Sequence, residues 1–136
     1  MDKKKETYLV LLTHGTWGEA LIESAQMIIG TIKNIYSFSL MPEDSVNEYL
    51  LNVENILNKL PEGTIIMVDL FAGSTSTIAA ALTNKYKVYP ISGLDLSMLI
   101  AADELRREYE GNELVEKVIE TSDDNRKNIY KLLNEN

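Results

Sequence analysis

The chain contains a single histidine, His14, which lies at the end of a short apolar run, Tyr8–Leu12, and precedes a glycine. An imidazole exchanges a proton near neutral pH, and its free ring nitrogen can act as a nucleophile. A carboxylate, Asp69, lies at the end of a second apolar run that reads TIIMVDL. A carboxylate that accepts the N–H of an imidazole determines which ring nitrogen is free and stabilises positive charge on the ring. His14 and Asp69 are therefore a candidate catalytic pair, if the fold brings them together.

The loop after Asp69 has the composition of an anion-binding site. It reads LFAGSTST, and Gly73 permits backbone angles and close approaches that other residues resist. Ser74 and Thr75 open a predicted helix, whose first N–H groups and dipole attract an anion. No lysine or arginine lies in this loop or in the stretch THGTWGEA around His14. We therefore expect backbone N–H groups and hydroxyls to hold a phosphoryl group here, with any arginine supplied by a partner.

Strands and helices must position these residues, and the sequence alternates between the two. Four apolar or alternating runs have the length and pattern of strands: 8–12, 34–40, 64–70 and 87–92. Four segments with apolar residues at helical spacing follow them in turn: 18–29, 45–60, 75–84 and 96–109. This alternation predicts an α/β fold: a doubly wound, mainly parallel sheet with helices on both faces and right-handed crossovers.

Three local details are also predicted. Ser74 is expected to cap the third helix through its hydroxyl. Pro90 is expected to shorten or end the fourth strand, because it cannot donate a hydrogen bond to the sheet. Residues 114–119 predict a further helix, whereas the segment after TSDDN fits either a helix with one apolar face or a short last strand.

The length of 136 residues suits a single domain over 1–136, and the flavodoxin-like strand order is the expected arrangement. In that order the first and third strands are adjacent, and ligands bind beyond their carboxyl ends. The first strand ends at His14 and the third at Asp69, so the predicted order places the two side chains opposite each other. Trp17 and Phe71 lie in the loops after these strands and are either core residues or an exposed docking rim.

The composition excludes several classes of function. The chain has a net charge of −8, a sequence pI of about 4.6 and no cysteine. A disulfide scaffold and a thiolate metal site are excluded, and with one histidine we expect no zinc site. An all-oxygen Mg²⁺ site is compatible with the composition, but we expect no metal and no cofactor. The acidic balance excludes nucleic acid as a partner and favours a basic protein. No apolar stretch is long enough for a secretory signal or a membrane span, so the predicted setting is the cytoplasm.

Other mechanisms fit the residues less well. A P-loop kinase requires GxxxxGK[ST], which is absent. A receiver domain carries a phosphorylated aspartate where Asp69 lies, but it needs an acidic pair where this chain has Thr13 and His14. A hydrolase built on Ser74, His14 and Asp69 lacks the G-x-S-x-G turn. A ligand-binding domain without enzymatic activity remains an alternative.

The pattern of a strand, THG and a helix, together with VDLFAGSTSTIAAAL and PISGLDLSMLIAA, resembles the enzyme IIA component of the mannose-type bacterial sugar phosphotransferase system (PTS) over about residues 7–120. The resemblance implies that His14 accepts a phosphoryl group from the histidine-containing phosphocarrier protein (HPr). His14 would pass it to a IIB domain, which phosphorylates sugar during transport by the membrane components IIC and IID. Asp69 would orient His14, and the phosphate would be bound by Gly15, Gly73, Ser74 and Thr75.

The sequence departs from the similar family in the loop, which commonly reads G-G-S-P-x-N. Here Ala72, Thr75 and Thr77 replace the first glycine, the proline and the asparagine, and Ser97 replaces a frequent proline. The family fold forms homodimers, in some members by exchange of a C-terminal strand, which implies a strand over 126–133. The related phosphotransfer subunit of dihydroxyacetone kinase shares the histidine, but its usual D-x-G-S-A motif is a poorer match. The sugar, and whether IIB is fused or separate, stay open.

Overall fold

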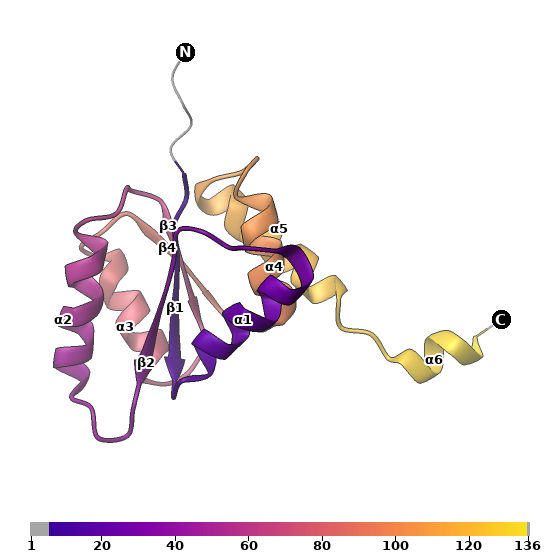
Figure 1. Ribbon diagram of the computed structural model, residues 1–136, viewed down its shortest axis with the longest axis horizontal. Coiled ribbons are helices and arrows are strands. Elements are labelled where there is room, and N and C mark those ends of the chain that lie inside the picture. The colour runs from indigo at the N-terminus through magenta and orange to yellow at the C-terminus, as the bar shows by residue number, and fades with distance from the viewer. Residues whose placement is uncertain (1–5, 136) are drawn as a thin grey trace, which may run out of the picture.

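The computed structural model describes residues 6–135. Four parallel strands form one sheet in the order β2-β1-β3-β4 (Figure 1). The strands are β1 (Leu9–His14), β2 (Ile35–Leu40), β3 (Thr64–Val68) and β4 (Val88–Ser92). β1 and β3 are hydrogen-bonded neighbours with Leu12 opposite Val68, which confirms the predicted flavodoxin-like order.

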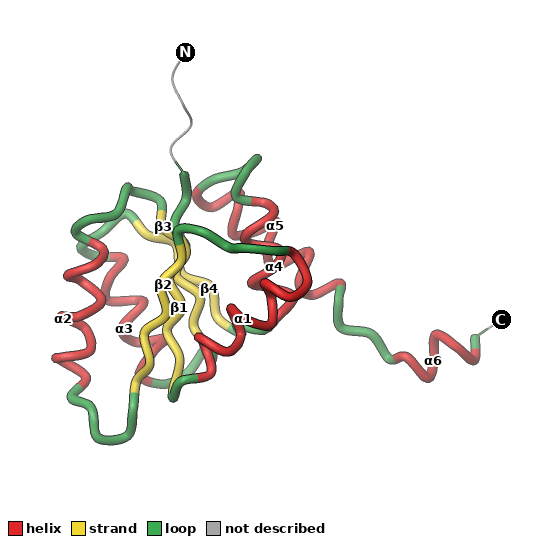
Figure 2. The backbone as a smooth tube through the Cα atoms, in the orientation of Figure 1, coloured by secondary structure: helices red, strands yellow, loops and turns green. Residues whose placement is uncertain are grey.

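Helices cover both faces of the sheet, as predicted (Figure 2). The helices are α1 (Trp17–Ile29), α2 (Val46–Leu57), α3 (Ser74–Thr83), α4 (Leu96–Leu105), α5 (Gly111–Asp124) and α6 (Ile129–Asn134). Leu9 and Leu11 of β1 pack with α1, α4 and α5, whereas Val10 and Leu12 pack with α2 and α3. Successive side chains of a strand point to opposite faces, so a strand that is covered on both sides reads as a continuous apolar run. The helices α1 to α5 thus enclose β1 and β3 and hold their carboxyl ends in place.

The start of α1 lies tightly against the sheet, three residues after His14. Gly18 is buried in α1, and a Cβ at this position would overlap the Ser37 hydroxyl of β2 and lie 3.3 Å from Cγ2 of Thr13. Only a residue without a side chain allows the backbone of the helix to come this close. This contact fixes the turn between β1 and α1, which carries His14.

One local prediction is wrong and a second is correct only in part. Gly73 is the N-cap of α3, and Ser74 is its first residue and makes no capping hydrogen bond through its side chain. The strand β4 is short, with five residues, but it does not end at Pro90 and continues to Ser92. β4 lies at the edge of the sheet, where a residue that lacks an N–H leaves the inner ladder intact.

The C-terminal segment forms a helix within this chain. α6 extends away from the body of the domain, beyond a turn that follows α5 (Figure 1). The strand that the resemblance implied over 126–133 is therefore not formed within this chain, where residues 129–134 are helical. Four apolar side chains of α6 are exposed, by 58–78%: Ile129, Tyr130, Leu132 and Leu133. Among residues 6–135, no helix is both long enough and apolar enough to cross a membrane.

Candidate functional site

His14 and Asp69 meet at the carboxyl edge of the sheet, where the sequence predicted them. His14 is the last residue of β1, and Asp69 follows the last residue of its neighbour β3. Nδ1 of His14 lies 2.9 Å from Oδ2 of Asp69, and the backbone N–H of His14 donates to the same oxygen at 2.7 Å. The ring hydrogen bond requires the proton on Nδ1, which leaves a lone pair on Nε2. The side chain of His14 is 47% exposed and that of Asp69 only 11%, so the reactive ring is accessible while its partner is covered.

The second oxygen of Asp69 also has a partner. The hydroxyl of Thr75 donates to Oδ1 at 2.7 Å. Burial of the Asp69 carboxyl raises its pKa, but hydrogen bonds from the His14 backbone, the Thr75 hydroxyl and the His14 ring lower it by more, so the net pKa is below the usual value. The group therefore stays a carboxylate throughout the neutral and mildly acidic range.

Gly73 brings the N-terminus of α3 next to Nε2 of His14. A Cβ on Gly73 would lie 3.6 Å from Cε1 and 4.0 Å from Nε2 of His14, and the residue has φ of +129°. The first backbone bond that closes α3 runs from the N–H of Thr77 to the carbonyl of Gly73, at 3.0 Å. The N–H groups ahead of Thr77 have no partner within the helix, so they are available to an anion at this end of α3.

The four predicted phosphate-binding residues divide into two groups. Gly73 and Ser74 lie on the open side of His14. Gly15 instead donates its N–H to the carbonyl of Leu40 at 2.8 Å, and its own carbonyl accepts from the hydroxyl of Thr13. Thr75 is fully buried and directs its hydroxyl at Asp69. These groups of Gly15 and Thr75 therefore hold the histidine and the carboxylate in place and are not directed at a ligand.

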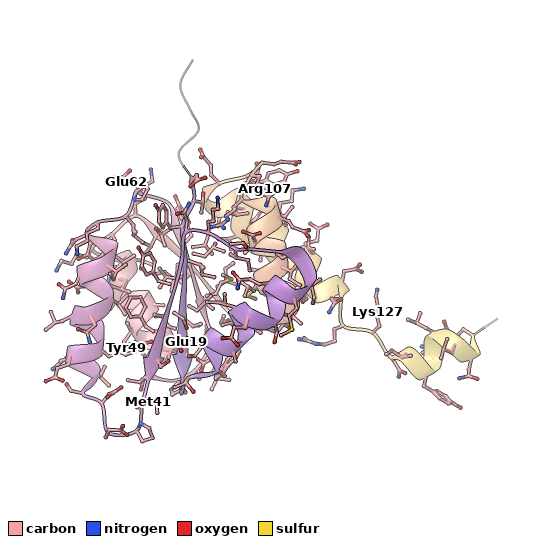
Figure 3. The ribbon with its side chains drawn as sticks, in the orientation of Figure 1. Glu19, Met41, Tyr49, Glu62, Arg107 and Lys127 are labelled. Carbon is pink, nitrogen blue, oxygen red and sulfur yellow. The ribbon has the colours of Figure 1, made fainter. Side chains whose placement is uncertain are left out.

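The loop between β2 and α2 forms a third side of the site that was not predicted from the sequence. A cavity of about 350 Å³ opens beside the imidazole and is lined by His14, Gly15, Leu40, Met41, Pro42, Asp44, Val46 and Ser74. Met41, labelled in Figure 3, lies in this loop, and its N–H donates to Oδ2 of Asp44 at 2.8 Å. Because β2 pairs with β1, the carboxyl end of β2 must lie at the same edge. The predicted strand order therefore already implies that the loop after β2 borders the site.

Tyr49 of α2 lies behind the site and was also missed. Its side chain is buried between α2 and the sheet (Figure 3), and its hydroxyl donates to the carbonyl of Phe38 at 2.6 Å. Burial raises the pKa of Tyr49 far above its usual value, the charges of Asp69 and Asp44 raise it further, and the Thr13 backbone opposes them. Tyr49 is therefore a neutral phenol. Its spacing with Val53 and Leu57 on the buried face of α2 could have revealed it.

The two predicted docking residues are exposed. Phe71 is 80% exposed and Trp17 is 37% exposed, so neither is a core residue. Leu70 and Val46, in the loop after β3 and at the start of α2, are exposed by 59% and 46%. Trp17 and Val46 are the first residues of α1 and α2, and Leu70 and Phe71 lie in the loop after β3. All four follow a carboxyl end of the sheet, and we refer to them together as the apolar rim.

The fold and the site together define a class of protein. A doubly wound parallel sheet presents one accessible imidazole, a carboxylate sets the free nitrogen of that imidazole, and a helix N-terminus lies beside it. This arrangement is suited to accepting an anionic group on Nε2. Among residues 6–135, no group of three or more histidine, aspartate and glutamate side chains is placed to hold a metal ion.

Residues 8–119 match the family model described as PTS system fructose IIA component, and the chain therefore belongs to this PTS enzyme IIA family. No match was found among curated proteins. Solved structures share the fold. The PTS component EIIA from Streptococcus agalactiae superposes with a TM-score of 0.85 at 24% identity, and the match covers 92% of this chain and 98% of that one.

Two further structures agree. The mannose/sorbose specific IIA subunit from Enterococcus faecalis gives a TM-score of 0.82 at 24% identity, with 90% of this chain and 93% of that chain covered. The PTS IIA protein associated with the fucose utilization operon from Streptococcus pneumoniae gives 0.80 at 19% identity, with 98% and 100% covered. The family and fold implied by the sequence resemblance are confirmed.

Proposed function

We propose that this protein is a phosphohistidine carrier of a PTS, which accepts a phosphoryl group from HPr on Nε2 of His14 and passes it to a IIB domain. The observation that carries the proposal is the hydrogen bond between Nδ1 of His14 and Asp69, at 2.9 Å, with Nε2 left free beside Gly73. The family membership supplies the direction of the relay.

The transfer exchanges one P–N bond for another. The lone pair of Nε2 forms a bond to phosphorus, the P–N bond to the donor ring of HPr breaks, and its electron pair returns to that ring. His14 keeps its proton on Nδ1 and becomes a phosphorylated imidazolium, whose positive charge the carboxylate of Asp69 stabilises. Transfer to IIB is the same exchange in the opposite direction. Positioning and electrostatic stabilisation dominate such a reaction.

The N-terminus of α3 provides hydrogen-bond donors for the phosphoryl oxygens. The N–H groups that precede Thr77 and the hydroxyl of Ser74, a residue that lines the cavity beside His14, are the proposed donors. The cavity is lined by Asp44 and by no lysine or arginine. A basic residue of the partner therefore complements both the phosphoryl group and the net charge of −8.

We assign partner docking to the apolar rim. Phe71 lies two residues after Asp69 and is 80% exposed, which suits an anchor that is buried only in a complex. Replacing Phe71 by serine should raise the KM for phosphorylated HPr and leave the rate at saturation nearly unchanged. Met27→Ser, at an 85% exposed position of α1, is the matched control. An unchanged KM for Phe71→Ser contradicts the docking role.

We also propose that the chain forms a homodimer through its C-terminal segment. α6 exposes four apolar side chains, and β4 is an edge strand of the described sheet. A cavity of about 370 Å³ lies between β4, α4 and α5, with Arg126 at its border. In the proposed dimer, the segment after α5 leaves its own domain and covers the corresponding region of a second copy.

The experiment for the carrier function uses the single histidine. Wild type and His14→Ala are incubated with phosphorylated HPr, and acid-labile phosphate is followed by intact mass. We expect one phosphoryl group on the wild type and none on His14→Ala. A wild type that gains no phosphate, or a His14→Ala variant that gains it equally, overturns the proposal. Subsequent addition of the IIB domain should remove the phosphate, whereas a dihydroxyacetone kinase subunit should not.

A further inference from the structure

The hydroxyl of Thr75 donates a hydrogen bond to Asp69, and the proposed phosphoryl relay does not by itself require this bond. Thr75 is the second residue of α3 and is fully buried. Its Oγ1 donates to Oδ1 of Asp69 at 2.7 Å, while Oδ2 accepts both hydrogen bonds from His14. Each oxygen of the carboxylate is therefore held by a different part of the chain.

From this arrangement we infer that Thr75 is a positioning residue, which sets the rotation of the Asp69 carboxylate and through it the tautomer and orientation of the His14 ring. The inference rests on the proposed function, because it concerns the same nucleophile.

The physical reason lies in the freedom that the carboxylate would otherwise have. Asp69 follows the last residue of β3, and rotation about its Cβ–Cγ bond exchanges or tilts the two oxygens. Both hydrogen bonds from His14 end on Oδ2, so they fix the position of that oxygen but not the rotation of the carboxylate plane. The hydrogen bond from Thr75 fixes the position of Oδ1 and therefore the rotation of the plane. Thr75 suits this task because its β-branched side chain has few rotamers and is surrounded by protein.

The position of Nε2 depends on this plane. A ring held at Nδ1 by an in-plane carboxylate oxygen directs Nε2 along one line, and in-line attack on phosphorus tolerates little deviation from that line. With Oδ1 released, the carboxylate can turn toward water, and the Nδ1–H tautomer loses part of its advantage over the Nε2–H tautomer. The Nε2–H tautomer has no lone pair on the reactive nitrogen.

The test compares Thr75→Val, which keeps the shape and removes the donor, with Thr75→Ser, which keeps the donor. Thr64→Val is the matched control, because Thr64 is also a buried threonine, 1% exposed, and donates its hydroxyl to the Pro61 carbonyl. Thr64 begins β3 and so lies at the end of that strand remote from Asp69. Thermal unfolding of all variants shows that they are folded and ranks their stability.

Two measurements separate positioning from stability. Nitrogen-15 NMR of the single imidazole reports the tautomer without assignment ambiguity, and rapid quench with phosphorylated HPr reports the rate of acceptance. For Thr75→Val we expect a smaller Nδ1–H fraction and acceptance that is slower by about tenfold, as is typical when an outer partner of a functional histidine is removed. Thr75→Ser should restore both to near the wild type, and Thr64→Val should change neither.

The inference is wrong if Thr75→Val retains the wild-type tautomer and rate, or if Thr75→Ser is impaired as strongly as Thr75→Val. If Thr75→Val does not fold, Thr75→Ala replaces it in both measurements. Alanine removes the same donor and has a smaller side chain than valine. The tautomer measurement needs no phosphate donor. If the wild type fails to accept phosphate, the proposed function fails, while the NMR comparison still accepts or rejects the role of Thr75.

Discussion

Oδ2 of Asp69 accepts two hydrogen bonds from His14, one from the backbone N–H at 2.7 Å and one from Nδ1 of the ring at 2.9 Å. The backbone bond joins the end of β1 to the residue that follows β3, and the side-chain bond uses the same oxygen. The orientation of the imidazole is thereby tied to the sheet itself. This relationship leads to the first two predictions.

Replacing Asp69 by asparagine should slow phosphoryl acceptance by roughly 10–100-fold while the protein stays folded. The neutral amide has no negative charge to stabilise the imidazolium. If its NH₂ group faces Nδ1–H, two donors oppose each other and no hydrogen bond forms. Rapid quench with phosphorylated HPr measures the rate, and Asp124→Asn, at a position whose side chain is 82% exposed, is the control. Equal rates of phosphoryl acceptance for the wild type and Asp69→Asn would contradict the orienting role of Asp69.

The stability conferred by the Asp69 carboxylate should depend on pH in a defined direction. Its burial raises the pKa, but the His14 backbone, the Thr75 hydroxyl and the His14 ring together hold it below the usual value. A folded-state pKa below the unfolded one stabilises the fold above about pH 3.9, and this contribution is lost as the pH falls through the folded-state pKa.

The Tm of the wild type should therefore exceed that of Asp69→Asn near neutral pH, and the difference should shrink below about pH 4. Thermal unfolding of both proteins at a series of pH values measures this difference. A difference that persists unchanged into strong acid would show that the carboxylate charge contributes nothing to stability.

Gly73→Ala should impair both the fold and the transfer. A residue with a side chain at φ of +129° is strained by about 1–3 kcal/mol, and its Cβ would lie 3.6 Å from Cε1 of His14. Relaxation of this strain moves the α3 N-terminus relative to Nε2. Gly63→Ala is the matched control, because Gly63 has φ of +98° in the turn before β3 and no atom within 4 Å of its added Cβ.

We expect both glycine variants to lose stability in urea unfolding, and only Gly73→Ala to accept phosphate more slowly. A Gly73→Ala protein with the wild-type rate would show that the approach of the loop to the ring is not needed. If Gly63→Ala also accepts phosphate slowly, lost stability alone explains the slow acceptance by Gly73→Ala.

Arg106→Ala should destabilise the protein without changing the site. The Arg106 guanidinium donates to the carbonyls of Thr7, Lys33 and Asn34, at the edge of the sheet opposite His14, and it pairs with the buried Asp103. Removal of one partner of a buried ion pair costs about 3–5 kcal/mol, because the other charge stays buried. Urea unfolding measures the loss, and the His14 imidazole signals of the folded variant should coincide with those of the wild type.

The exposed Arg126, whose side chain is 77% accessible, is the control for this prediction, and its replacement by alanine should cost less than about 1 kcal/mol. Equal losses for the two arginine variants would contradict the structural role of Arg106.

Deletion of residues 126–136 should convert the proposed dimer into a monomer. The deletion removes α6 with its exposed Ile129, Tyr130, Leu132 and Leu133 and leaves the helices of the core intact. Light scattering coupled to gel filtration measures the mass of both forms. A full-length chain that is already monomeric at high concentration, or a truncated chain that remains dimeric, would exclude assembly through this segment.

The order of the elements could be predicted because the signal is local. β1 and β3 are covered on both faces and read as unbroken apolar runs, and the helices between strands show apolar residues at intervals of three and four. The alternation of strands and helices along the chain restricts the topology to a few arrangements. The pairing of His14 with Asp69 followed from that topology, because parallel strands end at one edge.

Three details did not follow from local sequence. Ser74 has the residue type of a cap, but Gly73 takes the N-cap position next to the imidazole. Pro90 is tolerated because its strand is at an edge of the sheet. Tyr49 is buried, and its hydroxyl donates to the Phe38 carbonyl of β2. Each outcome depends on a contact with another element or on the position of a strand in the sheet.

Residue types and periodicity alone thus specified the α/β alternation, the strand order and the pairing of His14 with Asp69, because each follows from local pattern and from the geometry of parallel strands. Only the folded chain determined which groups remain available to a phosphoryl oxygen. Gly15 and Thr75 have suitable donors, but Leu40 and Asp69 engage them first. The direction of a hydrogen bond depends on where distant segments place their acceptors, and a linear sequence does not record that position.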